Sequence, residues 1–247
     1  MTMENTAYIN NKPFRIEPGE TILQFVRRHQ GRDLIPTLCQ SDNLENYGSC
    51  RICSVEVALR EGGPSRVMAS CHTPVAPGYY VYPSTEKIKR LRKNILELVL
   101  SEYPAKRLSP EPGMLPTEFQ SVVASAGSPE VRYRRKITEY DKDKSRPYVW
   151  SDFTECIKCY RCVRACDELQ TERVLWIHGR ADKSRIIKDF DRSFIESTCV
   201  SCGACVQTCP TNALFDRFSA KTLKADKIVR TTCTYCGVGC NLDVKVS

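Results

Sequence analysis

Fifteen cysteines carry most of the chemistry that this sequence could perform. Eight of them form two segments with the same spacing, Cys-x2-Cys-x2-Cys-x3-Cys, and each cysteine of the first segment has a counterpart 43 positions later. This spacing is typical of 4Fe–4S ligation, in which three cysteines of one loop bind one cube and the fourth binds the neighbouring cube. We therefore expect two cubes that exchange their fourth ligands. The first would take Cys156, Cys159, Cys162 and Cys209, and the second Cys199, Cys202, Cys205 and Cys166.

Structural zinc and disulfides are the two alternatives for these eight cysteines. Zinc sites use two Cys-x2-Cys pairs separated by a longer gap, whereas here three cysteines follow one another at the closer spacing. Disulfide frameworks belong to short secreted chains, and this chain has 247 residues. Pro210 follows the last cysteine, as a 4Fe–4S segment requires, while Asp167 takes that place in the first segment. The pattern therefore favours two 4Fe–4S clusters.

Four more cysteines lie in the first third of the chain, spaced Cys-x10-Cys-x2-Cys-x17-Cys. Residues 7–17 are predicted to form a β-hairpin, residues 21–30 a helix, and residues 51–60 a strand that turns at 61–64 into a second strand. This order resembles the β-grasp ferredoxin, and is closest to the module that opens the large iron–sulfur subunit of respiratory complex I and the iron-only hydrogenases. The resemblance implies a 2Fe–2S cluster, with zinc as the alternative, on Cys39, Cys50, Cys53 and Cys71.

A helix over residues 84–103 is expected to complete this first domain, which we place at residues 1–103. Ser84 or Thr85 caps the helix, and its apolar positions follow helical spacing. They are Ile88, Leu91, Ile95, Leu98 and Val99. His72 stands beside Cys71, and two histidines can replace two cysteines in a Rieske-type centre. Because four cysteines are already present, we expect no ligand role for His72.

Residues 104–147 contain neither cysteine nor histidine and carry six prolines. In the relatives just named, a His-x3-Cys-x2-Cys-x5-Cys site for another 4Fe–4S cluster lies here, and every one of those ligands is missing from this sequence. We therefore expect a proline-rich connecting segment that holds no metal. Its charge runs at 132–136 and 141–144 are interpreted as solvated faces.

Residues 148–225 are predicted to form the two-cluster ferredoxin domain. A short strand at 148–150 leads into the first cysteine loop, and residues 212–215 close the fold against it. Helices are expected over 161–169 and 203–208, each following its loop of three cysteines. Residues 173–180 and 184–190 favour two strands that form an insertion between the repeats. With the first domain, this gives an α+β chain.

The tail, residues 226–247, holds the last three cysteines at Cys-x2-Cys-x3-Cys spacing: Cys233, Cys236 and Cys240. The run CTYCGVGCNL resembles the opening of the molybdopterin oxidoreductase family, and specifically of formate dehydrogenase catalytic subunits. In that family a fourth cysteine completes a further 4Fe–4S site, so this site would need a ligand from a partner. The apolar residues after Cys236 predict one exposed strand that is ordered only against that partner. The alternative is that the tail is a remnant with no role.

Taken together, the chain resembles the N-terminal iron–sulfur portion of a cytoplasmic NAD(P)-linked formate dehydrogenase large subunit. The resemblance implies electron transfer between a flavin and iron–sulfur diaphorase subunit, on the 2Fe–2S side, and a molybdenum or tungsten catalytic subunit with molybdopterin. One alternative is an electron-transfer subunit of an iron-only hydrogenase or another NADH-linked reductase. A second is a scaffold with structural clusters. No nucleophile–base pair or glycine-rich nucleotide loop is visible, so we expect no active site within the chain.

Composition limits the other possibilities. The formal net charge is +8 before any thiolate-ligated cluster is counted, and no basic stripe or nucleic-acid-binding motif accompanies it. The first residues lack both the basic and the apolar region of a signal peptide. No apolar run is long enough to span a membrane. We therefore expect a cytoplasmic protein with neither nucleic acid nor membrane as a partner.

Overall fold

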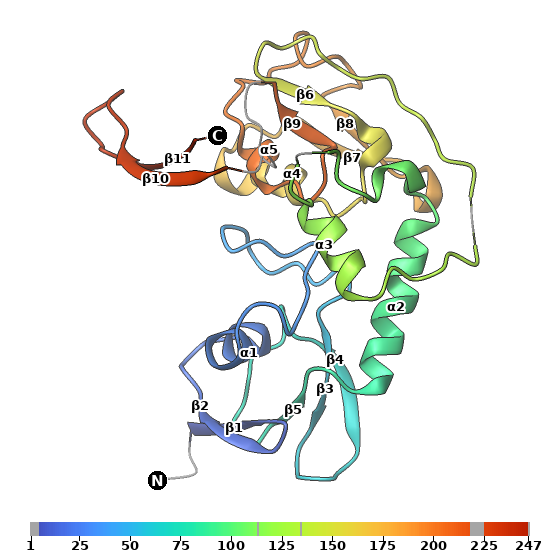
Figure 1. The fold of residues 1–247 in the computed structure, drawn as a ribbon, viewed down its shortest axis with the longest axis vertical. Coiled ribbons are helices and arrows are strands. Elements are labelled where there is room, and N and C mark those ends of the chain that lie inside the picture. Colours follow the sequence, from blue (N-terminus) through green and yellow to red (C-terminus); the bar gives the residue numbers. More distant parts are fainter. Residues whose placement is uncertain (1–4, 113, 134, 218–224, 247) are drawn as a thin grey trace.

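The computed structural model describes residues 5–112, 114–133, 135–217 and 225–246. Two folded parts lie at opposite ends of the molecule, with helices α2 and α3 between them (Figure 1). A two-stranded hairpin near the C-terminus extends away from this body. The helices in the middle therefore make the contacts that join the two ends.

The N-terminal part is a five-stranded sheet with one helix packed on it, as the sequence predicted for a β-grasp domain. The strands are β1 (Thr6–Ile9), β2 (Lys12–Arg15), β3 (Ser54–Ala58), β4 (Ser65–Ala69) and β5 (Tyr80–Tyr82). Their order is β2-β1-β5-β3-β4, in which β1 and β5 are parallel and the other pairs antiparallel. Strand β5 was not predicted, because its three residues give too short a pattern to be recognised.

Local signals explain the first hairpin and the first helix. Asn10 and Asn11 form the two-residue turn between β1 and β2, both at positive φ, which is the conformation that twists such hairpins correctly. Helix α1 (Ile22–Gln30) begins with a capping box between Thr21 and Gln24 and ends at Gly31. The buried face of α1 then packs into the core of this domain, where Phe25 and Val26 are inaccessible to solvent.

Strand β3, which was predicted within residues 51–60, is covered on both faces. All five of its residues are buried, including Glu56. The Glu56 carboxylate accepts hydrogen bonds from Ser65 Oγ (2.6 Å), Thr85 Oγ1 (2.6 Å) and Lys87 Nζ (3.0 Å). These bonds lower the pKa of Glu56 to about 2, with the two hydroxyl groups contributing most. A charged residue can therefore lie on the covered face of the strand, because its partners arrive from β4 and from the start of α2.

Helix α2 (Glu86–Leu100) is capped by Thr85, as predicted, and its buried face is partly the predicted one, because Ile95 and Val99 pack at the edge of the core. Ile88, Arg92, Leu96 and Leu100 are buried, whereas Leu98 is 61% exposed. The prediction counted only apolar residues, and Arg92 takes a position on the covered face.

The middle segment contains a helix, α3 (Glu118–Ser125), that the sequence analysis did not predict. Thr117 and Gln120 form a capping box at its start, and this Thr-x-x-Gln signal could have revealed it. Phe119 is fully buried, and its ring lies edge-on to Tyr103 with centroids 4.9 Å apart. Residues from both ends of the molecule contribute to this core: Leu38, Ile52, Leu96, Leu100, Tyr103, Phe119, Val122 and Val123, with Cys50 and Ile157 packed at its edge. The segment is therefore part of the folded body.

The C-terminal part has the elements predicted for the two-cluster domain. Strand β6 (Val149–Ser151) pairs with β9 (Leu214–Asp216), and β7 (Leu175–His178) pairs with β8 (Arg185–Lys188). Helix α4 (Arg161–Arg164) continues into a π-helical turn (Ala165–Leu169), and helix α5 (Ala204–Thr208) is its counterpart in the second repeat. Short 3₁₀ turns occupy Ala105–Arg107, Phe153–Glu155 and Ala181–Lys183.

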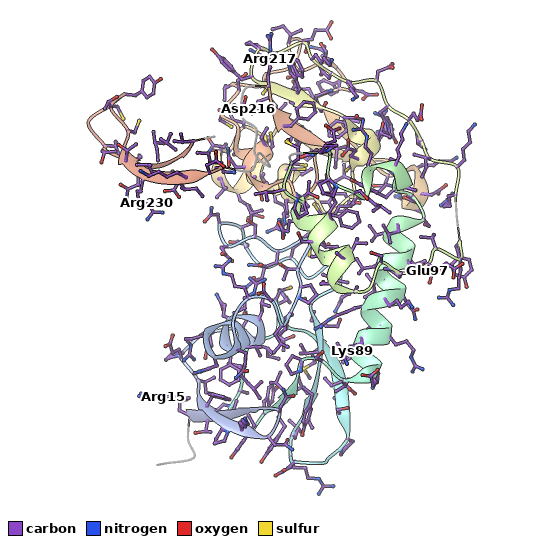
Figure 2. The ribbon with its side chains drawn as sticks, in the orientation of Figure 1. Arg15, Lys89, Glu97, Asp216, Arg217 and Arg230 are labelled. Carbon is purple, nitrogen blue, oxygen red and sulfur yellow. The ribbon has the colours of Figure 1, made fainter. Side chains whose placement is uncertain are left out.

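The tail forms a hairpin and not the single strand that was predicted. Strand β10 (Lys227–Thr232) pairs antiparallel with β11 (Asn241–Val246), and Arg230 bonds Asp243 across the pair at 2.9 Å. Figure 2 shows Arg230 on this hairpin, away from the rest of the molecule. Every described residue of both strands is exposed. In the described part of the chain, no helix is both long enough and apolar enough to cross a bilayer.

Candidate metal centres

The four N-terminal cysteines come together beside the sheet. Cys39 lies in the loop after α1, Cys50 and Cys53 precede β3, and Cys71 follows β4. The Cys50 amide donates to Cys39 Sγ at 3.5 Å. The Cys50 thiol bonds Cys39 and lowers its pKa to about 5, and the Cys71 thiol lowers that of Cys53 to about 6 in the same way. Two thiol pairs thus lie in one place, and the charge on Cys39 reaches the second pair.

The two cysteine repeats have the same backbone as well as the same spacing. Lys158 and Ser201, which are equivalent in the repeats, both have positive φ, and each donates its amide to the preceding loop cysteine at 3.4 Å. Tyr160 and Gly203 are also equivalent and also have positive φ. Left-handed residues that alternate with residues of negative φ turn the amides of a loop towards one point, which is a known way to surround an anionic cluster. Both loops therefore have the shape and the donors that a cube needs.

The fourth cysteine of each repeat lies against the other repeat. Burial raises the pKa values of Cys156, Cys159 and Cys162, and the charge of Cys209 raises each of them further. In the second group, burial raises the pKa values of Cys199 and Cys205, and Cys166 adds to both. Exchanged ligation requires this arrangement, in which Cys209 lies near the first loop and Cys166 near the second. The ligand sets themselves stay a prediction, which this arrangement favours.

A small cavity marks the second of these sites. All four predicted ligands line it, together with apolar residues of the domain core: Cys166, Cys199, Cys202, Cys205, Val149, Val174, Leu175 and Phe194. Burial raises the pKa values of the Cys199 and Cys205 thiols, and iron binding would displace their protons. Among the described residues, no three potential ligands are close enough to share a single metal ion. A cube differs from such a site because it spreads four thiolates over four irons.

The three tail cysteines lie in the turn between β10 and β11. Cys236 and Cys240 are exposed, and the Cys233 amide donates to the Cys240 carbonyl at 2.7 Å. This bond extends the hairpin and brings the first and last cysteine of the motif to opposite positions. The turn therefore presents three thiols at the tip of a projecting element.

Two arginines that the sequence analysis did not single out connect the first and second metal regions. Arg161 and Arg164 flank Cys162 on α4 and are both buried. Arg164 donates to the Cys39 carbonyl at 3.1 Å and to the Glu45 carbonyl, and its guanidinium lies 4.8 Å from the Tyr47 ring centroid. The charge of Arg161 acts on both Cys39 and Cys159. The 2Fe–2S loop and the first 4Fe–4S loop are therefore neighbours.

Carboxylates hold both arginines in place. Glu118 of α3 accepts two hydrogen bonds from Arg161, at 2.6 and 2.7 Å, and Glu168 accepts one from Arg164 at 2.9 Å. The Glu45 amide donates to the same Glu168 side chain at 2.9 Å. A signal for these residues exists in the sequence, since two arginines three positions apart surround a predicted ligand. Their partners, however, are as many as 125 residues away.

Three regions of the chain match known families of iron–sulfur domains. Residues 4–86 match the 2Fe-2S iron-sulfur cluster binding domain, and residues 155–213 match the 4Fe-4S dicluster domain. Residues 226–247 match the molybdopterin oxidoreductase Fe4S4 domain. The chain is an iron–sulfur electron-transfer module. The predicted α+β fold, with a 2Fe–2S domain followed by a two-cluster 4Fe–4S domain, is thereby confirmed for the module.

Relatives of the module include provisionally assigned formate dehydrogenases. One from Staphylococcus haemolyticus is 26% identical over an alignment of 285 positions, which covers 99% of this chain. Another, from Staphylococcus aureus strain USA300, is 24% identical and covers 96% of this chain. The module spans only 27% of the length of either relative. The predicted resemblance to formate dehydrogenases is confirmed at this level.

A solved structure is also similar to the module. It is a chain of an NAD⁺-reducing [NiFe]-hydrogenase in the H₂-reduced state, with a TM-score of 0.73 and 27% identity. The similarity covers 87% of the module and 88% of that chain. The module is thus similar to proteins of both formate dehydrogenase and NAD⁺-reducing hydrogenase type.

Proposed function

We propose that the module carries electrons between a flavin and iron–sulfur diaphorase subunit and a molybdenum or tungsten formate dehydrogenase catalytic unit. When bound, the clusters supply one-electron transfer, whereas NAD(P)H donates a hydride, so a flavin must stand between them. We place the complex in the cytoplasm, where NAD(P)H is available. The observation that carries the proposal is the series of cysteine groups, which runs from the sheet domain through α4 to a hairpin of molybdopterin oxidoreductase type.

The proposed clusters are one 2Fe–2S and two 4Fe–4S, ten irons in all. The first cluster uses Cys39, Cys50, Cys53 and Cys71; the second Cys156, Cys159, Cys162 and Cys209; the third Cys199, Cys202, Cys205 and Cys166. The contact of Arg164 with the Cys39 carbonyl, and the action of the Arg161 charge on both Cys39 and Cys159, support electron transfer from the first cluster to the second. Residues 1–103 and 148–225 form the two cluster domains. Residues 104–147, through α3, support the contact between them.

The hairpin is the proposed contact with the catalytic unit. Its strands expose apolar side chains, including Ile228 and Leu242, and its turn presents Cys233, Cys236 and Cys240. A two-stranded hairpin is at best marginally stable without further strands or a packed face, so a partner that adds both would stabilise it. The same partner would supply the fourth thiolate of a further 4Fe–4S site.

Limited proteolysis with iron analysis tests this contact. The catalytic unit is titrated into the iron-loaded module while cleavage after Lys227 and Arg230 is followed. Protection of both sites together with four additional irons per complex would support the proposal. A complex that passes electrons from NAD(P)H to the catalytic unit while cleavage and iron content stay unchanged would refute a role for the hairpin. Cleavage after Arg60, in the exposed turn between β3 and β4, serves as the control.

The similarity to the hydrogenase chain supports a second candidate, an electron-transfer chain of an NADH-linked hydrogenase. It rests on the 88% coverage of that chain. Reconstitution with each catalytic unit separates the two. Formate-dependent reduction of the clusters supports the first proposal, and H₂-dependent reduction in the absence of any response to formate would replace it with the second.

A further inference from the structure

Arg92 is a buried cation that lies behind the proposed 2Fe–2S site. It is 7% exposed on α2 and faces the end of the cysteine loop at β3. Its guanidinium donates to four backbone carbonyls: Ile52 (3.1 Å), Ser54 (2.9 Å), Pro83 (2.9 Å) and, at 3.5 Å, Leu34. Ile52 and Ser54 are the neighbours of Cys53 on either side. Arg92 therefore holds the backbone that carries one of the proposed ligands.

No carboxylate accompanies Arg92, and in this it differs from the other buried cations of the described residues. Arg161 pairs with Glu118 at 2.6 Å, Arg164 with Glu168 at 2.9 Å, and Lys188 with Asp143 at 2.8 Å. Within the described part of the chain, Arg92 forms no ion pair within 4.0 Å. Its carbonyl partners satisfy its hydrogens but carry no net charge, so the guanidinium keeps an unbalanced positive charge in the interior.

Cys53 lies between the two residues, Ile52 and Ser54, whose carbonyls accept hydrogen bonds from the Arg92 guanidinium. Burial lowers the pKa of Arg92 to about 10. Arg92 is therefore still charged at neutral pH. Arg27 also faces Cys53, but Asp42 lies 3.7 Å from Arg27 and balances part of its charge. Arg92 therefore differs from Arg27 in that no carboxylate neutralises its charge, so this charge can act on the cluster.

We propose that Arg92 is the fixed counter-cation of the 2Fe–2S cluster. It raises the reduction potential of the cluster and stabilises the iron-loaded site relative to the empty site. The inference rests on the proposed ligands Cys39, Cys50, Cys53 and Cys71. A cluster bound by four thiolates is anionic and gains one more negative charge on reduction, so a nearby buried cation stabilises the reduced form more than the oxidised form. Arg92 thus acts on the potential through its position and is not itself a ligand.

The test compares Arg92→Met, Arg92→Lys and Arg90→Met in the iron-loaded chain. Arg90 lies on the same helix but is exposed, so it serves as the matched control. The midpoint potential of each cluster is read by electron paramagnetic resonance in a redox titration. We expect Arg92→Met to lower the equilibrium constant for reduction of the 2Fe–2S cluster at least tenfold, or about 59 mV for one electron. In Arg92→Lys the midpoint potential of the 2Fe–2S cluster should stay close to the wild-type value, and in Arg90→Met it should be unchanged.

Several outcomes would overturn the proposal. An unchanged 2Fe–2S potential in Arg92→Met would do so, as would an equal shift of all three clusters. A wild-type chain with no 2Fe–2S signal would instead refute the proposed cluster and this inference with it. If Arg92→Met retains too little cluster for titration, the rate of iron loss to a chelator is compared between Arg92→Lys and Arg92→Gln. Slower iron loss from Arg92→Lys than from Arg92→Gln would support a role for the positive charge. Equally fast iron loss from both variants would refute that role.

Discussion

Replacing Arg164 by methionine should loosen the loop of residues 39–50 from the first 4Fe–4S segment. The substitution keeps a long apolar side chain but removes the guanidinium that donates to the Cys39 and Glu45 carbonyls. Cys39 is fully buried, so its carbonyl would lose a partner that water cannot easily replace. Glu45 is exposed, so water can bind its carbonyl. Most of the cost should therefore come from Cys39.

The expected magnitude follows from these contacts. A hydrogen bond from a charged donor contributes about 1.5–3 kcal/mol when its partner is buried. The contact of Arg164 with the partly exposed Tyr47 ring adds about 0.5–1 kcal/mol. We expect a loss of about 3 kcal/mol in the free energy that closes this loop. Because about 1.4 kcal/mol corresponds to a factor of ten, the open form should become roughly 100 times more populated.

Amide hydrogen exchange measures this opening directly. The Leu44 amide donates to Ser41 and the Glu45 amide to Glu168, so exchange at both reports on the loop. Both should exchange roughly 100 times faster in Arg164→Met. Arg173→Met is the control, because Arg173 forms only an exposed pair with Asp167, for which about 1 kcal/mol or less is expected. If exchange at Leu44 and Glu45 changes less than threefold in Arg164→Met, the guanidinium does not hold the loop.

Three further predictions concern the ligands of the first 4Fe–4S cluster, the core around Phe119 and the pH dependence of stability. Cys209→Ala should remove the cube at Cys156, Cys159 and Cys162 and leave the Cys199 cube, as read by iron content and electron paramagnetic resonance; the reverse loss would contradict exchanged ligation. Phe119→Ala should lower the free energy of unfolding by about 3–5 kcal/mol in denaturant titrations, because a fully buried ring is lost. Ser121→Ala, at an exposed position of the same helix, should lower it by less than about 1 kcal/mol. Equal losses in the two variants would show that α3 contributes nothing to the core. The depressed pKa of Glu56, about 2, gives stability that is present above its ordinary pKa of 4.5 and lost as pH falls towards 2. Glu56→Gln should therefore lower stability by about 2–3 kcal/mol at pH 7, and the difference from wild type in thermal unfolding should shrink below about pH 4.5; a difference independent of pH would contradict this origin.

Elements with local signals were predicted well. The hairpin of β1 and β2 was predicted from its alternating apolar positions, α1 from the spacing of its apolar residues, and α2 from its cap at Ser84 or Thr85; the structure adds the turn at Asn10 and Asn11 and the capping box of Thr21 and Gln24. Such signals involve residues within four positions of each other, so they act in any context that permits the element. Helix α3 has the same kind of signal at Thr117 and could have been found. It was missed because the surrounding prolines and charges suggested a connection.

The cysteine spacing by itself determined the class of metal centre, since a loop of three cysteines limits which irons its thiolates can reach. Only the tertiary structure decided which charges surround those centres. Arg164 meets the Cys39 loop and Glu118 meets Arg161 across long stretches of chain. Arg92 occupies the covered face of α2, where an apolar count predicts no arginine. The physical reason is that a buried charge is stable only beside partners that folding brings to it, and those partners leave no trace in the local pattern.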